Sequence, residues 1–394
     1  MSRDLDVAEE CVQEAYAAAM STWPRDGVPA NPTGWLVTAA RRRAVDVVRR
    51  EQVLRSKLPL LVVPEEDDAA GDGRALAPAE EEHAIRDETL RLVFLCCHPA
   101  LAPEAQLALT LRLVCGVETR DLARLFVVPQ PTMAARLTRA KRKIATARIP
   151  FRVPPEDEWA GRLQGVLGVV YLLLTAGHAV PSGPSLVRDE LADRALHLAR
   201  TLHDLVPDEP EVRGLLALLL VTRARRGTRV DDAGRLVPLA DQDRVQWDAE
   251  AVAEADALVT GALRAGPPGR YTLQAAIALL HAQAPSYEET DWAQIVVLYD
   301  ALLAAWPSPV VRLNRAVALA AARGPEAALV EVDLIERGGE LAAFRYLPAV
   351  RADLLARLGR DADAARAFEQ AIALADNEVE RDHLRGRLEA LRRP

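Results

Sequence analysis

The sequence predicts an all-α protein with several domains. Half of its 394 residues are hydrophobic but only 4% are aromatic, so Ala, Leu and Val must build the core, which is typical of helical proteins. Apolar residues recur at helical spacing along most of the chain, and Pro and Gly separate these segments. One segment, Thr228–Val237, reads as a strand or hairpin with its turn at Asp232–Gly234.

Composition divides the chain into four expected parts. We expect a helical domain over residues 1–58, a flexible acidic linker over 59–85, a second helical domain over 86–150 and a third over 151–394. The linker is predicted from its prolines and glycines and from Glu65–Glu88, which holds ten acidic and two basic residues. It separates two basic segments, Trp35–Lys57 (seven basic, two acidic) and Arg120–Arg152 (nine basic, one acidic). In a chain of net charge −8, two such segments indicate two separate contacts with a polyanion.

The first domain is expected to contain two helices. From Leu5 to Ala19 small apolar residues recur at helical spacing, and Trp23–Pro29 is expected to be a loop. The second helix is expected over Pro32–Arg50, with Trp35 near its start and arginines along it. Arginines on a helix can contact phosphates, and an aromatic at its start can stack on an unpaired base. The alternative for Trp35 is a place in the core.

Residues Glu118–Ile144 predict a helix-turn-helix motif. A short helix over Thr119–Phe126 and a second over Thr132–Ala147 flank a tight connection, and each begins with a threonine that can cap it. In the second helix the apolar residues form one stripe, at Met133, Leu137, Ala140 and Ile144. The opposite face is threonine-rich and basic. Because such a helix fits the major groove, with its N-terminal half near base edges, we predict that it contacts DNA.

The last domain is predicted to consist of Ala- and Leu-rich helices. They are expected at Trp159–Thr175, Leu186–Leu205, Glu211–Arg225, Ala249–Ala265, Tyr271–Ala284, Thr290–Ala305 and Val310–Ala322, and onward to Leu391. Val350–Leu358, Gly359 and Ala362–Leu374 have the pattern of a tetratricopeptide unit, and Val310–Ala322 with Pro325–Ile335 is a looser match. Stacked helix pairs form concave surfaces that bind proteins or peptides, the alternative being a plain helical domain without a groove.

Other classes of protein are disfavoured. Cys96-Cys97-His98 has no second Cys or His pair at metal spacing, so buried thiols are the preferred interpretation and we expect neither a metal nor a cofactor. No phosphate-binding glycine loop or nucleophile motif occurs, so we do not expect an enzyme. The longest apolar stretch, Gly165–Gly177, is too short to span a bilayer, and no signal peptide is evident. We therefore expect a cytoplasmic protein with no membrane contact.

The segments Ala8–Tyr16 and Asn31–Arg50 and the helix-turn-helix resemble the two conserved domains of bacterial sigma factors of the extracytoplasmic-function (ECF) type. Ala8–Tyr16 is similar to the region 2.2 helix that docks on the polymerase clamp, Asn31–Arg50 to regions 2.3–2.4 that open and read the −10 element, and the helix-turn-helix to region 4.2 that reads the −35 element. Met1 stands close to the clamp-binding helix, so region 2 is expected to lack its first helix. The remainder resembles the ECF subgroup with a tetratricopeptide-like C-terminal extension.

The resemblance implies partners and site residues. The partners are RNA polymerase core and promoter DNA, with a small DGPF (YCII-related) protein or another regulator at the C-terminal domain. Polymerase contacts are expected at Glu9, Glu10, Gln13 and Glu14. Contacts with the −10 element are expected at Asn31, Trp35, Arg41, Arg42, Arg43, Arg49 and Arg50. Contacts with the −35 element are expected at Thr132, Ala135, Arg136, Thr138, Arg139, Lys141, Arg142 and Lys143.

Two other functions remain open from the residues alone. An ordinary helix-turn-helix regulator with a tetratricopeptide-like sensor domain would bind duplex DNA without polymerase. A tetratricopeptide scaffold with incidental basic helices would have no salt-dependent affinity for DNA. The second basic helix, with Trp35 at its entrance, favours the sigma factor, because a repressor needs no module for strand opening.

Overall fold

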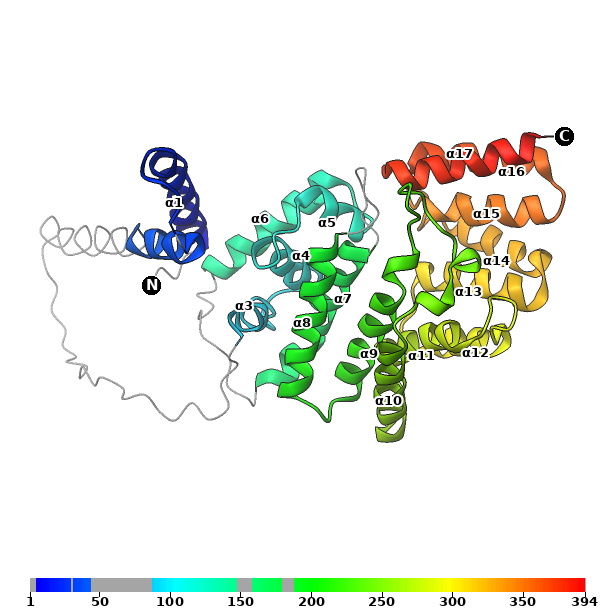
Figure 1. Cartoon of the computed structure of the whole chain (residues 1–394), viewed down its shortest axis with the longest axis horizontal. Helices are drawn as coiled ribbons and strands as arrows, with labels where there is room; N and C mark the ends of the chain where they lie inside the picture. The colour runs from blue at the N-terminus through cyan, green and yellow to red at the C-terminus, as the bar shows by residue number, and fades with distance from the viewer. Residues whose placement is uncertain (1–4, 30, 44–86, 147–157, 179–187, 394) are drawn as a thin grey trace, which may run out of the picture. The chain divides into compact units, whose positions relative to one another are not determined.

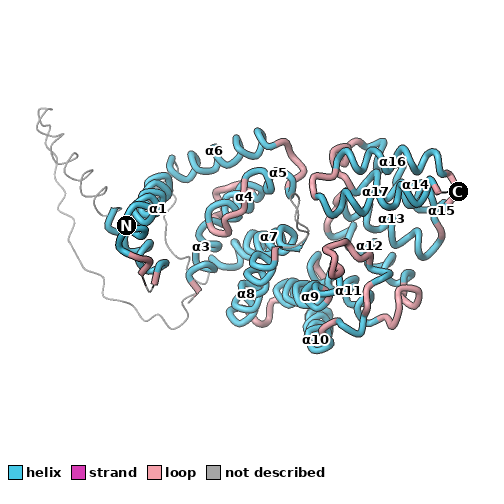
Figure 2. Tube along the Cα trace, turned by 45° about the horizontal axis from the view of Figure 1, so that its top comes forward, coloured by secondary structure: helices cyan, strands magenta, loops and turns pink. Residues whose placement is uncertain are grey.

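The computed structural model describes residues 5–29, 31–43, 87–146, 158–178 and 188–393 (Figure 1). Across these residues the regular structure is helical, so the all-α prediction is confirmed (Figure 2). The predicted hairpin at Thr228–Val237 is reduced to one isolated antiparallel bridge, between Val230 and Leu236. Its turn is closed by Gly234 at φ +76°.

The chain divides into two compact units. One consists of residues 1–84 and 138–152, and the other of residues 85–137 and 153–394. The predicted linker at 59–85 lies outside the described residues.

In the first unit, helix α1 runs over Leu5–Asp26, and a second helix begins at residue 32 and is described to residue 43. The predicted loop at Trp23–Pro29 is wrong in its first half, because α1 continues through Pro24. Pro24 has no N–H to bond the carbonyl four residues before it, and α1 ends two residues later, at Asp26. Gly27 then ends the helix at φ +84° and donates its N–H to the Trp23 carbonyl (2.9 Å).

The segment after the undescribed residues 44–86 forms four helices. These are α3 (Glu88–Cys96), α4 (Pro103–Leu113), α5 (Thr119–Leu125) and α6 (Gln130–Thr146). Asp87 caps α3 by accepting the Leu90 N–H (2.7 Å). The first three helices pack on the helices that follow α6, so residues 85–137 belong to the same compact unit as the C-terminal helices.

The C-terminal region is a succession of helices in which sequence neighbours pack on each other. They are α7 (Trp159–His178), α8 (Asp189–Leu205), α9 (Pro210–Ala224), α10 (Ala249–Ala265), α11 (Arg270–Gln283), α12 (Trp292–Ala305), α13 (Pro309–Arg323), α14 (Pro325–Gly338), α15 (Tyr346–Arg357), α16 (Asp361–Leu374) and α17 (Glu378–Arg392). The helix predicted to start at Leu186 is described only from Asp189. Every other predicted helix lies within a few residues of its observed bounds.

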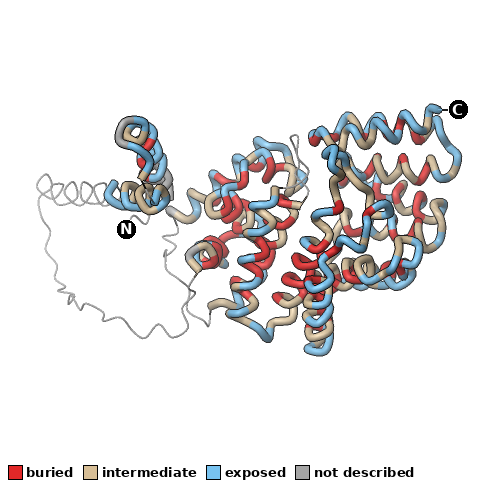
Figure 3. The backbone as a smooth tube through the Cα atoms, in the orientation of Figure 1, coloured by how far each residue is buried: buried red, intermediate tan, exposed pale blue. Residues whose placement is uncertain are grey.

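Buried residues form stripes on the helix faces that meet, as Figure 3 shows. Helix α7 alone among the described helices is both long and apolar enough to cross a membrane. Of that apolar window, 56% is buried among the neighbouring helices, as in a central core helix. Two glycines let α4 approach it closely, since a Cβ on Gly165 would lie 2.6 Å from Gln106 Oε1 and one on Gly168 would lie 2.7 Å from a Leu107 methyl.

Candidate nucleic-acid interface

Helices α5 and α6 are joined by a tight turn at residues 126–129. Phe126 and Val128 donate backbone N–H bonds to the carbonyls of Leu122 (3.0 Å) and Ala123 (2.9 Å), which closes the end of α5. Val127 sits in the left-handed region at φ +52°, an uncommon conformation for a β-branched residue. The two helices are present as predicted, with ends shifted by one or two residues.

The two predicted threonine caps are wrong. Glu118 precedes α5 and makes no side-chain cap, and Thr119 is the first helical residue. Helix α6 begins at Gln130 rather than Thr132, and the Met133 N–H bonds to the Pro129 carbonyl (3.1 Å). Pro131 fits within the first turn because the N–H it lacks would have no intrahelical partner there.

Helix α6 has one apolar face and one basic face. Met133, Leu137 and Ala140 are buried and Ile144 is half-buried, so the predicted stripe is confirmed. The helix contains five basic residues and no acidic one. Of the residues expected to contact the −35 element, Thr132, Ala135, Thr138, Arg139, Arg142 and Lys143 are exposed, and Arg136 and Lys141 are partly exposed. One helix face therefore presents cations and small polar groups together.

Arg136 is held differently from the other cations of α6. Its guanidinium lies 5.7 Å from the centre of the Phe126 ring, in the turn before the helix. Such a cation–π contact fixes the side chain along the surface of the turn.

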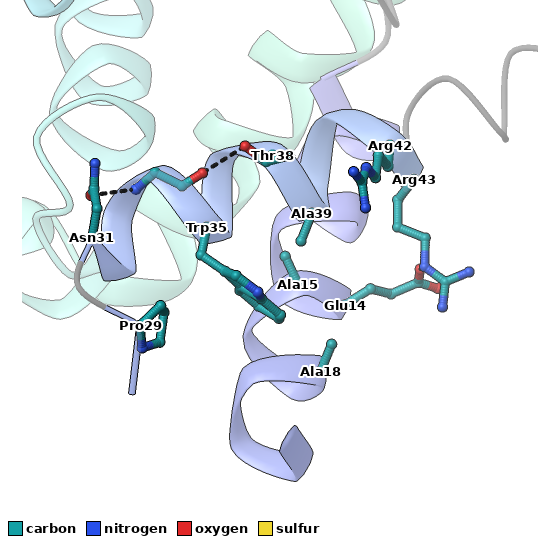
Figure 4. A pocket seen from close by; sticks show the side chains of 11 residues that line it. Glu14, Ala15, Ala18, Pro29, Asn31, Trp35, Thr38, Ala39, Arg42 and Arg43 are labelled. Atoms are coloured by element: carbon teal, nitrogen blue, oxygen red, sulfur yellow. Dashed lines mark hydrogen bonds and ion pairs between the residues drawn. The ribbon is translucent and has the colours of Figure 1, made fainter. Parts of the chain in front are cut away.

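The first unit contains a second cationic surface, next to a cavity. Helix α1 and the 32–43 helix enclose about 800 Å³, lined by Trp35, Asn31, Arg42 and others (Figure 4). Trp35 is half-buried and packs edge-on against Trp23, with ring centres 5.5 Å apart. It thus belongs both to the packing between the two helices and to the cavity wall. Asn31 caps the 32–43 helix by accepting the Gly34 N–H (2.9 Å).

One ion pair joins a residue expected to contact polymerase to a residue expected to contact the −10 element. Glu14 on α1 pairs with Arg43 (3.1 Å), and both side chains are about half exposed. Gln13, Arg41 and Arg42 are exposed. The side chains of Glu9 and Glu10, together with Arg49 and Arg50, lie outside the described residues.

Helices α3 to α5 are fixed to the C-terminal helices by polar as well as apolar contacts. Arg162 of α7, only 5% exposed, donates to the Phe94 carbonyl (3.1 Å) and pairs with Glu158. Asp121 of α5 is buried and lies 3.0 Å from Nη1 of Arg188. Helices α3 and α5 are therefore attached to the C-terminal region, while the basic face of α6 stays exposed.

Sequence reasoning missed one contact of α5. Arg124 donates two hydrogen bonds to Oδ2 of Asp376, from Nε (2.9 Å) and Nη2 (2.7 Å). Asp376 directly precedes Asn377, which caps α17. The two residues are 252 positions apart, so no local pattern signals their pairing.

The cysteines near the motif are buried thiols. Burial raises the pKa of Cys96 to about 12 and that of Cys115 to about 11, so both thiols stay protonated at neutral pH. Among the residues that the structure describes, no three His, Cys, Asp or Glu side chains lie where they could hold a metal ion.

Where it is described, the chain is all-helical, and α6 presents an exposed basic face beside a large C-terminal helical region. Residues 1–53 match sigma-70 region 2, and residues 162–263 match a family of unknown function, DUF6596. The chain is also 43% identical to an uncharacterized protein of Rhizobium meliloti (strain 1021) over 389 residues, which is 99% of this chain and 91% of that protein. The chain belongs to one family with this relative, and the match over residues 1–53 supports membership of the sigma-70 family. Sigma-70 proteins are non-enzymatic transcription factors whose partners are RNA polymerase core and promoter DNA.

Proposed function

We propose that the chain is a sigma factor of the ECF type, acting in the cytoplasm and regulated through its C-terminal helical region. Region 2, over residues 1–58, recognises and melts the −10 element. Region 4, over residues 86–150, recognises the −35 element, and residues 59–85 link the two. The tetratricopeptide-like region 151–394 receives the regulatory signal, with a small DGPF/YCII-like protein as a candidate partner.

The observation that carries this proposal is the exposed basic face of α6 in a chain whose first 53 residues match sigma-70 region 2. Ala135, Thr138 and Arg139 lie toward base edges in the major groove. Thr132, Arg136, Lys141, Arg142 and Lys143 lie near phosphates. An arginine that makes a bidentate contact with guanine is worth about 1–3 kcal/mol of discrimination.

The first unit supplies the −10 contacts. Its cavity of about 800 Å³, with Trp35 in one wall and Arg42 at its edge, is large enough for an unstacked base. Flipped bases are held by stacking on aromatic rings and by nearby cations. Arg41, Arg42 and Arg43 lie toward the backbone of the melted strand, and Glu9, Glu10, Gln13 and Glu14 toward the polymerase clamp.

The attachment of α3–α5 to the C-terminal helices supports regulation through that region. Arg162, Arg188 and Asp376 each bond to a residue or backbone group of α3 or α5. A change in the C-terminal helices would therefore reach α3 and α5 through direct contacts.

Run-off transcription with purified core polymerase tests the proposal. We expect the chain to co-elute with core and to direct initiation from its own promoters. Arg139→Ala should lose about 1–3 kcal/mol of binding at one base pair of the −35 element and leave the other positions unchanged. The matched control is Arg264→Ala, which removes an exposed arginine from the last turn of α10.

Two results would contradict the proposal. Failure to bind core polymerase, with specific binding of the chain alone to duplex DNA, would identify an ordinary helix-turn-helix regulator. If Arg139→Ala weakens every −35 sequence equally, Arg139 is a phosphate contact and its proposed role in base recognition is wrong.

A further inference from the structure

The C-terminal helices enclose a cavity that none of the proposed DNA or polymerase contacts uses. Its volume is about 410 Å³, within the range of small-molecule sites. Side chains of α13, α15, α16 and α17 form its walls, joined by Arg229 and Leu236 from the segment between α9 and α10 and by Tyr287. The cavity lies wholly within the second unit.

Much of the cavity lining is apolar. Val317 and Tyr346, which are 41% and 36% exposed, contribute apolar surface to it. Ala320, Leu354 and Phe368 lie behind them and are fully buried. Exposed apolar groups gathered in one concave site are typical of a surface that a ligand covers.

The two carboxylates of the cavity are already paired. Glu380 accepts hydrogen bonds from Arg345 Nε (2.6 Å) and from the Tyr346 hydroxyl (2.6 Å). Asp353 pairs with Nη2 of Arg387 (2.6 Å). These pairs cancel in charge, so they give the cavity no net preference for a cation or an anion.

Two further arginines leave the cavity with an excess of positive charge. Among the described residues, neither Arg229 nor Arg357 has a carboxylate within ion-pair distance. Arg229 donates to the His178 carbonyl and Arg357 to the Ala320 carbonyl (3.1 Å), which are both neutral partners. The Glu380 carboxylate, which is paired with Arg345, attracts Arg229 from beyond ion-pair distance. A guanidinium has five N–H donors, so each of these two arginines has donors beyond the one that bonds to its carbonyl.

The segment behind Arg229 reinforces this positive charge. Arg225 and Arg244 lie over the Trp247 ring, 5.0 and 4.8 Å from its centre, and neither pairs with a carboxylate within the described part of the chain. Burial, together with the charges of Arg229 and Arg244, lowers the pKa of Arg225 to about 10. An anion bound near Arg229 would relieve part of this repulsion among like charges.

We propose that this cavity binds a small organic acid, whose carboxylate pairs with Arg229 and Arg357 and whose aryl or branched-alkyl body covers the apolar lining. A carboxylate satisfies the excess positive charge, and guanidinium groups pair with carboxylates through two parallel hydrogen bonds. An amine of the same shape is repelled by the two arginines. The neutral amide fills the space but forms no charge-assisted bond.

Calorimetric titration of the full chain, without polymerase or DNA, tests this proposal independently of sigma activity. The probes are phenylacetate, benzoate, indole-3-acetate and 4-methylpentanoate, each beside its amide, with phenethylamine as the cation. We expect at least one acid to bind at millimolar concentration or below and its amide to bind at least about tenfold more weakly. A tripeptide ending in Phe, with a free or amidated carboxyl group, tests whether a chain terminus is the better source of the carboxylate.

Three variants locate the site. Arg357→Gln and Arg229→Gln should each weaken binding of the acid by about tenfold, because each removes a charge-assisted pair. Arg360→Gln is the matched control: this exposed arginine follows α15 outside the cavity and pairs with Asp363 (2.7 Å). The proposal is overturned if no acid of the panel binds, if the acid and its amide bind equally, or if both arginine variants retain full affinity. Tighter binding of the free-carboxyl peptide than of every acid would overturn the assignment to a small molecule.

Discussion

The ion pair between Arg124 and Asp376 gives a sharp test of how the C-terminal helices act on the DNA-binding motif. In helix-turn-helix proteins the first helix crosses the DNA backbone, so the proposed function implies that Arg124, in the last turn of α5, lies near phosphates. Asp376 holds the Arg124 guanidinium through two hydrogen bonds, at 2.7 and 2.9 Å. While that pair persists, Arg124 is not free to bind a phosphate. We therefore expect Asp376→Asn to increase promoter binding.

The size of the effect follows from the exposure of the pair. The side chains of Arg124 and Asp376 are 20% and 48% exposed, so solvent screens much of their attraction. Partly exposed pairs are worth at most about 1 kcal/mol, which corresponds to about a fivefold gain in affinity when Arg124 is released. Run-off transcription and filter binding of the reconstituted holoenzyme measure this gain. It should shrink as salt increases, because a phosphate contact releases counterions.

A double-mutant cycle isolates the contact. In an Arg124→Gln background, Asp376→Asn should have no further effect. Asp382→Asn is the matched control, since this exposed residue of α17 pairs within its own helix, with Arg385. Unchanged promoter binding in Asp376→Asn, or a gain that persists without Arg124, would refute the reasoning.

Three further predictions concern stability. Gly165→Ala should destabilise the chain by about 1–3 kcal/mol in thermal unfolding, since its Cβ would lie 2.6 Å from a Gln106 oxygen. On the same helix, the added Cβ of Gly161→Ala meets nothing within 4 Å, so this control should be neutral or stabilising. Equal effects of the two substitutions would disprove this packing. Met133→Ala should cost about 2–5 kcal/mol, because the side chain is fully buried, and a melting temperature equal to that of the unchanged chain would contradict its place in the core. Burial, followed by the charges of Arg225 and Arg244, lowers the pKa of His281 from 6.5 to about 4, so the unfolded chain binds the proton first and stability should fall as pH drops from 6.5 to 4. His281→Gln should reduce that pH dependence in thermal melts, and an unaltered profile would exclude His281 as its source.

The sequence predicted the helices well because helix formation depends on local patterns. The stripe at Met133, Leu137 and Ala140 repeats at the helical period, and the structure buries all three. The errors in the predicted helices were at their ends, because no single capping or breaking residue determines by itself where a helix starts or stops. Helix α1 continued two residues past Pro24, to Asp26, and α6 began at Gln130 instead of at its predicted threonine cap.

The candidate DNA-binding residues were also identifiable from the sequence, because charge and helical period together place cations on one face of α6. The sequence could not show that α3–α5 pack on α7 and α8. The close approach at Gly165 and Gly168 brings together α4 and α7, which are far apart in the sequence. Nor could it show which arginines are paired. Among the described residues, Arg345 and Arg387 have carboxylate partners, whereas Arg229 and Arg357 bond to carbonyl groups, and no local pattern distinguishes the two pairs.

By itself, therefore, the sequence determined the helical class, the order of the helices and the basic face of α6, because each depends on residues within a few turns of one another. Only the tertiary structure decided the contact between Arg124 and Asp376 and the cationic cavity among α13, α15, α16 and α17. Both features depend on side chains of separate helices that come together in space. Such contacts are determined by how the helices pack and not by the local periodicity of the sequence.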